Sequence, residues 1–258
     1  MAEVEQAETT DDRLFAGTLG LRQPARRAGY SVNVDAILLA AFAARVLATG
    51  ERPLATARAR HAVDLGAGVG AIGLTLLHLA AATRVTMVEN DALLARLALE
   101  NADANGWSAR VDVVPDDIRA AMKALSSKAD LVVCNPPYVP PGRGRAPAAR
   151  VRSAKYGELG AFVEAARRIA GGRARACFVY PAIEATALLT ALRANGLEPK
   201  RLRAVHGRSG DPARVVLVEA VPGKAGGLAI EPPLVETAHG GARTAEIAAL
   251  LSTPPVTR

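Results

Sequence analysis

The chain has 258 residues, of which 50% are hydrophobic and 22% are charged. This balance excludes collagen-like, low-complexity and disordered classes, and it suits one α/β domain of ordinary size or two small ones. The longest uncharged run, residues 65–83, contains glycines and a histidine, which favours a loop and a helix over a membrane span. Two cysteines, Cys134 and Cys177, are too few for a disulfide framework, and the sequence has no metal-ligand spacing, so no metal is expected.

Basic residues outnumber acidic residues by 32 to 25, which gives a net charge of +7. Five of the acids lie within residues 1–12, where no basic residue occurs, so we expect a flexible acidic tail there rather than a secretory leader. Most of the basic residues are arginines, which are better planar partners than lysines for phosphates and bases. We therefore expect a cytoplasmic protein with a polyanionic partner, the alternative being a solvated arginine-rich surface.

Apolar spacing predicts a strand or hairpin at residues 14–22 and a helix at 34–47, with Asp35 near its N-terminus. From residue 61 onward, short apolar runs alternate with helical stretches, which is typical of a parallel sheet with helices on both faces. The predicted strands of this sheet are 61–65, 84–88, 110–114, 129–134 and 173–180. The predicted helices are one that ends near residue 81, 91–105, a short one from residue 116, 157–170 and 182–195.

Residues 197–206 and 213–221 follow as two strands without a helix between them, which predicts an antiparallel hairpin at the sheet edge. The expected fold class is therefore α/β, with a doubly wound, Rossmann-like, seven-stranded and mostly parallel sheet that has one antiparallel edge strand. Residues 139–156 lack any period and indicate a long loop, whereas 244–251 indicate a final helix. The expected units are a tail (1–12), an N-terminal hairpin and helix (13–60), a main domain (61–221) and a C-terminal extension (222–258).

The segment DLGAGVGAIG follows the first strand of the predicted sheet. Glycine lets the backbone approach a ligand closely, and the helix after the loop points amide groups at that ligand. Two overlapping sets of small residues fit a dinucleotide fingerprint: Gly66, Gly68 and Ala71, and Gly68, Gly70 and Gly73. The loop alone thus indicates an adenosine-containing cofactor, with a bare tight turn as the alternative.

Three acids near this loop refine the cofactor. Asp64, just ahead of the loop, favours S-adenosylmethionine, because the cationic amino group of that molecule suits a nearby carboxylate. Glu89, at the end of the second strand, could accept hydrogen bonds from ribose hydroxyls. Asp117, after the third strand, is placed to meet the adenine amino group, although Asp116 or Asp117 could equally serve as a helix N-cap.

The tetrapeptide Asn135-Pro136-Pro137-Tyr138 follows the fourth strand, at the carboxyl end where open α/β sheets place their active sites. An amino group on a conjugated ring is a poor nucleophile, because its lone pair is delocalised. The Asn135 side-chain oxygen and the Pro136 carbonyl can each accept one of its N–H hydrogens, which aims the nitrogen at a sulfonium methyl and stabilises its tetrahedral transition state. Tyr138 would stack on the planar substrate, and Pro137 would line the same site. A rigid strand stop is the alternative interpretation.

Together, DLGAGVG, Glu89, Asp117 and NPPY resemble the class I S-adenosylmethionine-dependent amino methyltransferases of the N6-adenine type, over residues 62–221. Residues 29–43 (GYSVNVDAILLAAFA) and 232–251 are similar to the bacterial tRNA1(Val) (adenine-N6)-methyltransferase family, although Ser31 and Val32 stand where that family often has an Arg and an aromatic residue. The resemblance implies the methyltransferase fold and S-adenosylmethionine as cofactor. It also implies a tRNA substrate, at the adenine beside the anticodon of a valine tRNA. Asp35 would be a further cofactor contact, or simply an acid in the first turn of a helix.

The predicted loop 139–156 carries five basic residues and no acid: Arg143, Arg145, Arg150, Arg152 and Lys155. Because this loop leaves directly from NPPY, we expect its first four cations to clamp RNA phosphates at the rim of the active site. A mobile, solvated loop is the alternative. The target adenine would have to be unstacked, most easily from a single-stranded loop.

Four other functions share part of this pattern. A release-factor glutamine methyltransferase uses NPPY but has a sizeable helical domain ahead of the glycine loop, and a ribosomal guanine-N2 methyltransferase is usually longer. An RNA-binding module without catalysis is disfavoured by intact Asn135 and Tyr138. A nicotinamide oxidoreductase has no use for NPPY. The sequence therefore favours an N-methyltransferase that acts on tRNA, and it indicates neither a membrane partner nor an oligomeric state.

Overall fold

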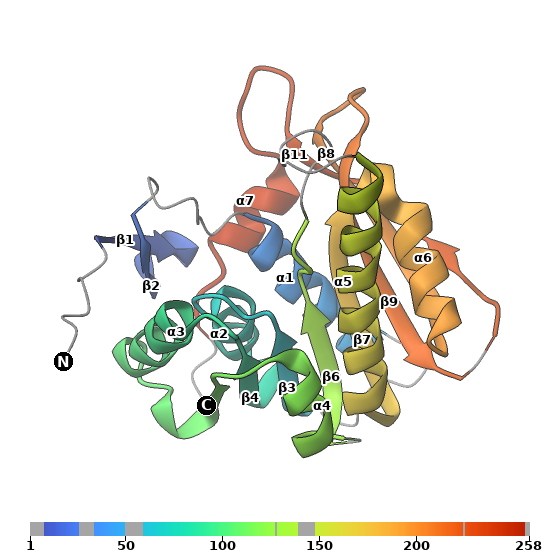
Figure 1. Cartoon of the computed structure of the whole chain (residues 1–258). Helices are drawn as coiled ribbons and strands as arrows, with labels where there is room; N and C mark the ends of the chain where they lie inside the picture. The colour runs from blue at the N-terminus through green and yellow to red at the C-terminus, as the bar shows by residue number, and fades with distance from the viewer. Residues whose placement is uncertain are drawn as a thin grey trace.

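The computed structural model describes residues 8–25, 34–49, 59–126, 128–138, 148–223 and 225–255. An antiparallel hairpin of β1 (Thr9–Leu14) and β2 (Leu19–Pro24) precedes helix α1 (Val34–Thr49). The rest of the described chain forms a large sheet covered by helices on both faces (Figure 1). The predicted α/β, doubly wound architecture is therefore confirmed.

The described part of the sheet has the order β10-β8-β9-β7-β6-β3-β4-β5, with β11 also paired to β8. All of its strands run parallel except β9, so the mostly parallel prediction holds. The bounds are β3 (Ala59–Leu65), β4 (Ala82–Val88), β5 (Val111–Val114), β6 (Ala129–Cys134), β7 (Ala170–Pro181), β8 (Leu197–Arg208), β9 (Ala213–Pro222), β10 (Ala229–Ile230) and β11 (Leu234–Thr237).

Two details of the sheet differ from the sequence prediction. The reversed strand β9 pairs with both β7 and β8, so it lies inside the sheet and not at its edge. Its residues 215–220 are all buried, whereas most of β8 is only half-buried, and the more apolar strand of a hairpin gains more from the inner place. The C-terminal extension adds the short strands β10 and β11 beyond β8.

Two apolar clusters hold the helices on opposite faces of the sheet. One cluster packs α1, α2, α3 and the N-terminal hairpin, and the other packs α4, α5 and α6. Successive residues of a strand point to opposite faces, so Leu131 and Val133 of β6 join the first cluster and Val132 and Cys134 join the second. The remaining bounds are α2 (Ala71–His78), α3 (Ala92–Ala104), α4 (Ile118–Ala124), α5 (Ala148–Ile169), α6 (Ala185–Ala194) and α7 (Ala245–Leu251).

Two segments that the sequence predicts to be irregular are regular. Helix α5 begins at Ala148 rather than at residue 157, because residues 148–156 contain good helix formers and no breaker, and Pro147 directly precedes them. Residues 9–12 belong to β1 rather than to a flexible tail. Their charge is offset across the hairpin, where the Asp11 carboxylate lies 3.0 Å from Nε of Arg22.

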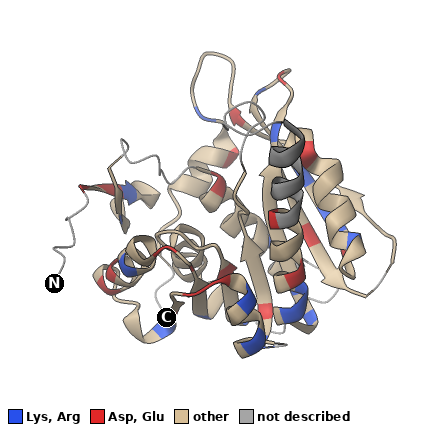
Figure 2. Ribbon diagram, viewed as in Figure 1, with Lys and Arg blue, Asp and Glu red and all other residues tan. Residues whose placement is uncertain are grey.

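Charge is distributed unevenly between the two edges of the sheet. The last turns of α4 and α5 carry Lys123, Arg167 and Arg168, and Figure 2 shows this basic end at the bottom of the view. Cations at helix C-termini are stabilised by the helix dipole. At the opposite edge, where the parallel strands end, the described residues next to those ends include Glu89 and Asp117.

Candidate active site

Neighbouring parallel strands end side by side at the carboxyl edge of the sheet. In the register, Leu65 of β3 lies opposite both Cys134 of β6 and Val88 of β4, and Val88 lies opposite Val114 of β5. The residues that follow the first three strand ends form one row: Gly66, Asn135 and Glu89. Neighbouring strands lie about 4.8 Å apart, so the row from β6 to β5 spans about 15 Å. Three motifs that are far apart in the sequence thus meet at one edge.

The glycine loop and Glu89 form one hydrogen-bonded unit. Gly66, Gly68 and Gly70 have φ angles of 68°, 57° and 87°, a left-handed backbone that residues with side chains rarely adopt. The Gly68 N–H donates to Oε2 of Glu89 at 2.8 Å, and the Asp91 N–H donates to Oε1 at 2.9 Å. An ionised carboxylate can accept about four hydrogen bonds. Glu89 therefore shapes the loop and keeps acceptor capacity for two further donors, such as ribose hydroxyls.

A pocket of about 480 Å³ opens beside this row, a volume within the usual range for small-ligand sites. Asp117 lines the pocket and also caps α4, because its Oδ1 accepts the N–H of Arg119 at 2.7 Å. The N-cap interpretation is thus confirmed, and the contact with adenine stays a prediction. The other lining residues are Gly66, Val88, Asn90, Asp116, Ile118, Arg119, Glu158, Ala161 and Phe162.

Helix α5 contributes three pocket residues that the sequence analysis does not identify: Glu158, Ala161 and Phe162. Glu158 and Phe162 are four positions apart and so share one helix face. The Phe162 ring lies against Gly66, where an added Cβ would approach its Cε1 to 3.1 Å. Their spacing is the only signal in the sequence, and it does not say which face of the helix meets the glycine loop.

Replacing Phe162 by alanine is expected to weaken the binding of S-adenosylhomocysteine about tenfold, since a ring against a nucleoside contributes roughly 1–3 kcal/mol. Phe162→Leu keeps much of the apolar area and should fall between alanine and the unaltered chain. Titration calorimetry of the three proteins measures this order. Equal affinities for all three would show that the ring does not face the ligand.

Asp64 lies beneath the glycine loop and is fully buried. Its Oδ2 accepts the N–H of Gly73 at 2.9 Å, whereas its Oδ1 has no hydrogen-bond partner among the described residues. Burial raises the pKa of this carboxyl to about 7, and the hydrogen bond from Gly73 only partly offsets that effect. A buried carboxylate oxygen without a partner fits a site that takes a cationic ligand, but the contact of Asp64 with the cofactor amino group stays a prediction.

The four NPPY residues directly follow β6 and differ in how far their side chains are exposed. Pro136 is buried, Asn135 and Tyr138 are half-buried, and Pro137 is exposed. Among the residues that the structure describes, none forms a hydrogen bond with the Asn135 side chain, so its amide can meet a ligand. The Tyr138 ring meets Tyr180 of β7 edge-on, with 5.9 Å between centroids and an interplanar angle of 82°. The sequence analysis does not identify Tyr180, which fixes the orientation of the ring expected to stack on the substrate.

Asp35 lies in the first turn of α1 and forms a bidentate ion pair with Arg214, with N–O distances of 2.6 and 2.9 Å. Arg214 also pairs with Glu236 of β11, so it joins α1, β9 and β11. This ion pair explains Asp35 without a ligand, and its predicted contact with the cofactor remains untested.

The cations of the predicted loop are mostly beyond what the structure describes. Arg143 and Arg145 lie outside the described residues. Arg150 and Arg152 belong to the first turns of α5, but their side chains also lie outside the described part. The proposed phosphate clamp therefore stays a prediction.

Cys134 and Cys177 are buried and unpaired with each other, and burial raises the pKa of both thiols well above the usual range. Both pack as small apolar groups in the sheet. Across the described ranges, no three His, Cys, Asp or Glu side chains come together in a way that would hold a metal ion. None of the described helices combines the length and the apolar character needed to cross a membrane.

Comparison with known proteins agrees with this geometry. The model of the family "Methyltransferase small domain" matches residues 41–150. The tRNA1(Val) (adenine(37)-N6)-methyltransferase of Cronobacter sakazakii is 36% identical over 132 residues, which is 50% of this chain but only about half (49%) of the relative. The protein of the same name from Aeromonas hydrophila is 31% identical over 195 residues, covering 74% of this chain and 77% of the relative.

Among solved structures, the crystal structure of a predicted O-methyltransferase from Agrobacterium tumefaciens has a TM-score of 0.63 at 24% identity. The match covers 87% of the present chain and 99% of the Agrobacterium protein. At this identity the likeness shows the fold alone, which is the methyltransferase form of the Rossmann-like sheet. The sequence relatives go further, because one of them is matched over more than two thirds of its length. The chain therefore belongs to the family of the tRNA1(Val) (adenine(37)-N6)-methyltransferases, within the S-adenosylmethionine-dependent methyltransferases.

Proposed function

We propose that the protein transfers a methyl group from S-adenosylmethionine to the exocyclic N6 amino group of an adenine in tRNA. One observation carries this proposal: the sheet register sets Asn135 directly beside the glycine loop that follows Leu65. An amide at that place can grip an amino group next to a bound cofactor. The names of the relatives support adenine 37 of a valine tRNA as the acceptor.

The residues present fit S-adenosylmethionine. Glu89 and Asp117 offer carboxylate oxygens to the ribose and the adenine, and Asp64 holds a buried carboxylate oxygen without a described partner. When bound, the cofactor supplies an electrophilic methyl group on a sulfonium sulfur.

The chain's own contribution to the reaction lies in NPPY. The side-chain oxygen of Asn135 and the backbone carbonyl of Pro136 accept hydrogen bonds from the two N–H groups of the amino group that is methylated. These bonds hold its nitrogen in line for attack and favour the tetrahedral geometry of the transition state. Tyr138, braced by Tyr180, supports the plane of the base. No strong general base is required, because the nitrogen becomes acidic as it is alkylated. The same site could hold a glutamine amide, so the acceptor has to be tested directly.

The acceptor test uses the protein with radiolabelled S-adenosylmethionine and, in separate reactions, unmodified total tRNA, ribosomal RNA and release factor. Label in tRNA that is released as N6-methyladenosine supports the proposal. Label in the release factor identifies a glutamine methyltransferase, and N2-methylguanosine in ribosomal RNA identifies the other alternative. A tRNA substrate would place the protein in the cytoplasm.

Neutralising Arg143, Arg145, Arg150 and Arg152 together is expected to flatten the salt dependence of tRNA binding. Each phosphate contact with single-stranded RNA adds about 0.7 to the slope of log K against log salt concentration, so the slope should fall by about 3. A matched control replaces four cations at the opposite edge of the sheet, Arg60, Lys123, Lys128 and Arg173, which are all exposed. Equal changes in slope for both variants would refute a clamp at the active-site rim.

A further inference from the structure

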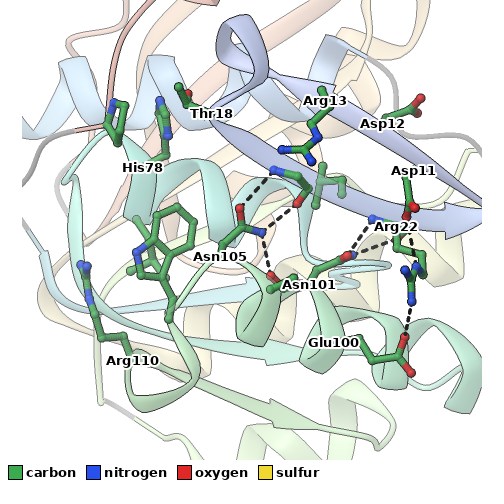
Figure 3. Close-up of a pocket in the computed structure, with 16 residues that line it drawn as sticks. Asp11, Asp12, Arg13, Thr18, Arg22, His78, Glu100, Asn101, Asn105 and Arg110 are labelled. Atoms are coloured by element: carbon green, nitrogen blue, oxygen red, sulfur yellow. Dashed lines mark hydrogen bonds and ion pairs between the residues drawn. The ribbon is translucent and has the colours of Figure 1, made fainter.

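The N-terminal hairpin is joined to α3 by two asparagine side chains one helical turn apart (Figure 3). Asn105 accepts the N–H of Gly20 at 3.0 Å through Oδ1 and donates to the Gly20 carbonyl at 2.8 Å. Asn101 does the same two residues further along β2: it accepts the Arg22 N–H at 2.6 Å and donates to the Arg22 carbonyl at 2.9 Å. Each amide thus takes the place of a peptide group in a neighbouring strand.

Asn101 makes one contact that Asn105 does not. Its Nδ2 also donates to the carbonyl of Val69 at 3.0 Å, and Val69 lies inside the glycine loop between Gly68 and Gly70. The corresponding second bond of Asn105 goes to the carbonyl of Asn101, within α3 itself. One side-chain amide therefore binds the hairpin and the cofactor loop at once.

The hydrogen bond between Asn101 and the Val69 carbonyl lies where solvent has little access. Asn101 is 2% exposed and Val69 is fully buried, so water does not readily replace the bond. Beside the two asparagines lies a pocket of about 630 Å³ that is lined by residues of both the hairpin and α3 (Figure 3). The ion pair of Arg22 with Glu100, which also crosses there, is long at 3.8 Å and half exposed. The buried hydrogen bonds of the two asparagines thus add a directional link to the apolar packing of Leu19 and Leu21 in the same cluster as α3.

We propose that Asn101 is a positioning residue for the cofactor-binding loop, and that through it the N-terminal hairpin is energetically coupled to cofactor binding. The inference rests on the proposed function only in taking S-adenosylmethionine as the ligand of the loop. Holding the Val69 carbonyl keeps the Gly68 N–H directed at Glu89, which is the arrangement that the cofactor meets. Because coupling is reciprocal, a ligand that orders the loop also stabilises the hairpin.

The test compares two variants that lose a similar number of hairpin bonds, Asn101→Ala and Asn105→Ala. Calorimetric titration with S-adenosylhomocysteine should give about tenfold weaker binding for Asn101→Ala and a change below twofold for Asn105→Ala. At saturating S-adenosylmethionine, kcat of Asn101→Ala should stay within about twofold, while KM for the cofactor rises. Equal effects of the two variants on affinity would assign Asn101 an ordinary structural role and overturn the proposal.

Hydrogen exchange measures the coupling separately. In the unaltered chain and in Asn105→Ala, S-adenosylhomocysteine should slow exchange of the Arg22 amide, and in Asn101→Ala it should not. Asn101→Asp serves as a second variant if alanine destabilises the fold, since a carboxylate keeps the acceptor for the Arg22 N–H and loses the donor to the carbonyls of Val69 and Arg22. If the unaltered chain fails to bind the ligand, the proposed function falls; normal binding that Asn101 does not influence overturns this inference alone.

Discussion

Asn135→Ala is expected to lower kcat about 10²–10³-fold, the usual effect of removing one hydrogen-bond partner that acts in the transition state. The affinity for S-adenosylhomocysteine should stay within about twofold, because the pocket beside the glycine loop is lined by other residues. Single-turnover methylation of tRNA and calorimetry measure the two quantities. The half-buried side chain makes no described hydrogen bond, so its removal should cost little stability.

Two further variants separate the chemical role of Asn135 from a local structural one. Asn135→Asp keeps an oxygen that can accept the N–H of the acceptor, so it should recover part of the lost activity. As a control, Asn195→Ala removes the asparagine at the C-terminal end of α6, which lies on the same face of the sheet as α4 and α5, and it should leave kcat unchanged. Full activity of Asn135→Ala would contradict the assigned role. So would an equal loss of kcat in Asn135→Ala and Asn135→Asp that is accompanied by a lower free energy of unfolding in both variants.

Asp64→Asn is expected to change the pH dependence of stability. The folded state raises the pKa of Asp64 from 3.8 to about 7, chiefly through burial, so the protonated acid is the form that the fold favours. This contribution is fully present below pH 4 and is lost as the pH rises to about 7. At roughly 1.4 kcal/mol for each pH unit, the unaltered chain should lose on the order of 4 kcal/mol relative to the amide variant across that window. Urea unfolding of both proteins between pH 4.5 and 7.5 measures the difference.

Cofactor binding provides an independent check on Asp64. If its carboxylate faces the amino group of the cofactor, binding near pH 6.5 should release up to about three-quarters of a proton, because an acid with a pKa of about 7 is mostly protonated there and a nearby cation lowers that pKa. Calorimetry in buffers with different ionisation heats counts the released protons. An equal release by Asp64→Asn would place the titrating group elsewhere and leave Asp64 as a support for the N-terminus of α2.

The sequence predicted the elements whose signals are local. The glycine loop, the acid at the end of β4 and NPPY each follow a short apolar strand, and parallel strands end at one edge, so their meeting could be inferred before any contact was known. The first turns of α5 lack an apolar period, so the sequence pattern predicts a loop there, although helix formers alone sustain a helix. Phe162 and Tyr180 were missed for a related reason: which face of an element meets the site depends on its neighbours.

The sequence by itself determined the fold class and the edge of the sheet at which the glycine loop, Glu89 and NPPY meet, because these depend on short-range backbone preferences and strand direction. Tertiary structure alone decided the partners of the buried polar groups. Asp35 meets Arg214 across 179 positions, and Asn101 meets Val69 across 32. A buried carboxylate or amide must find a partner somewhere, but only the packing of α1 on β9, and of α3 on the glycine loop, selects which one.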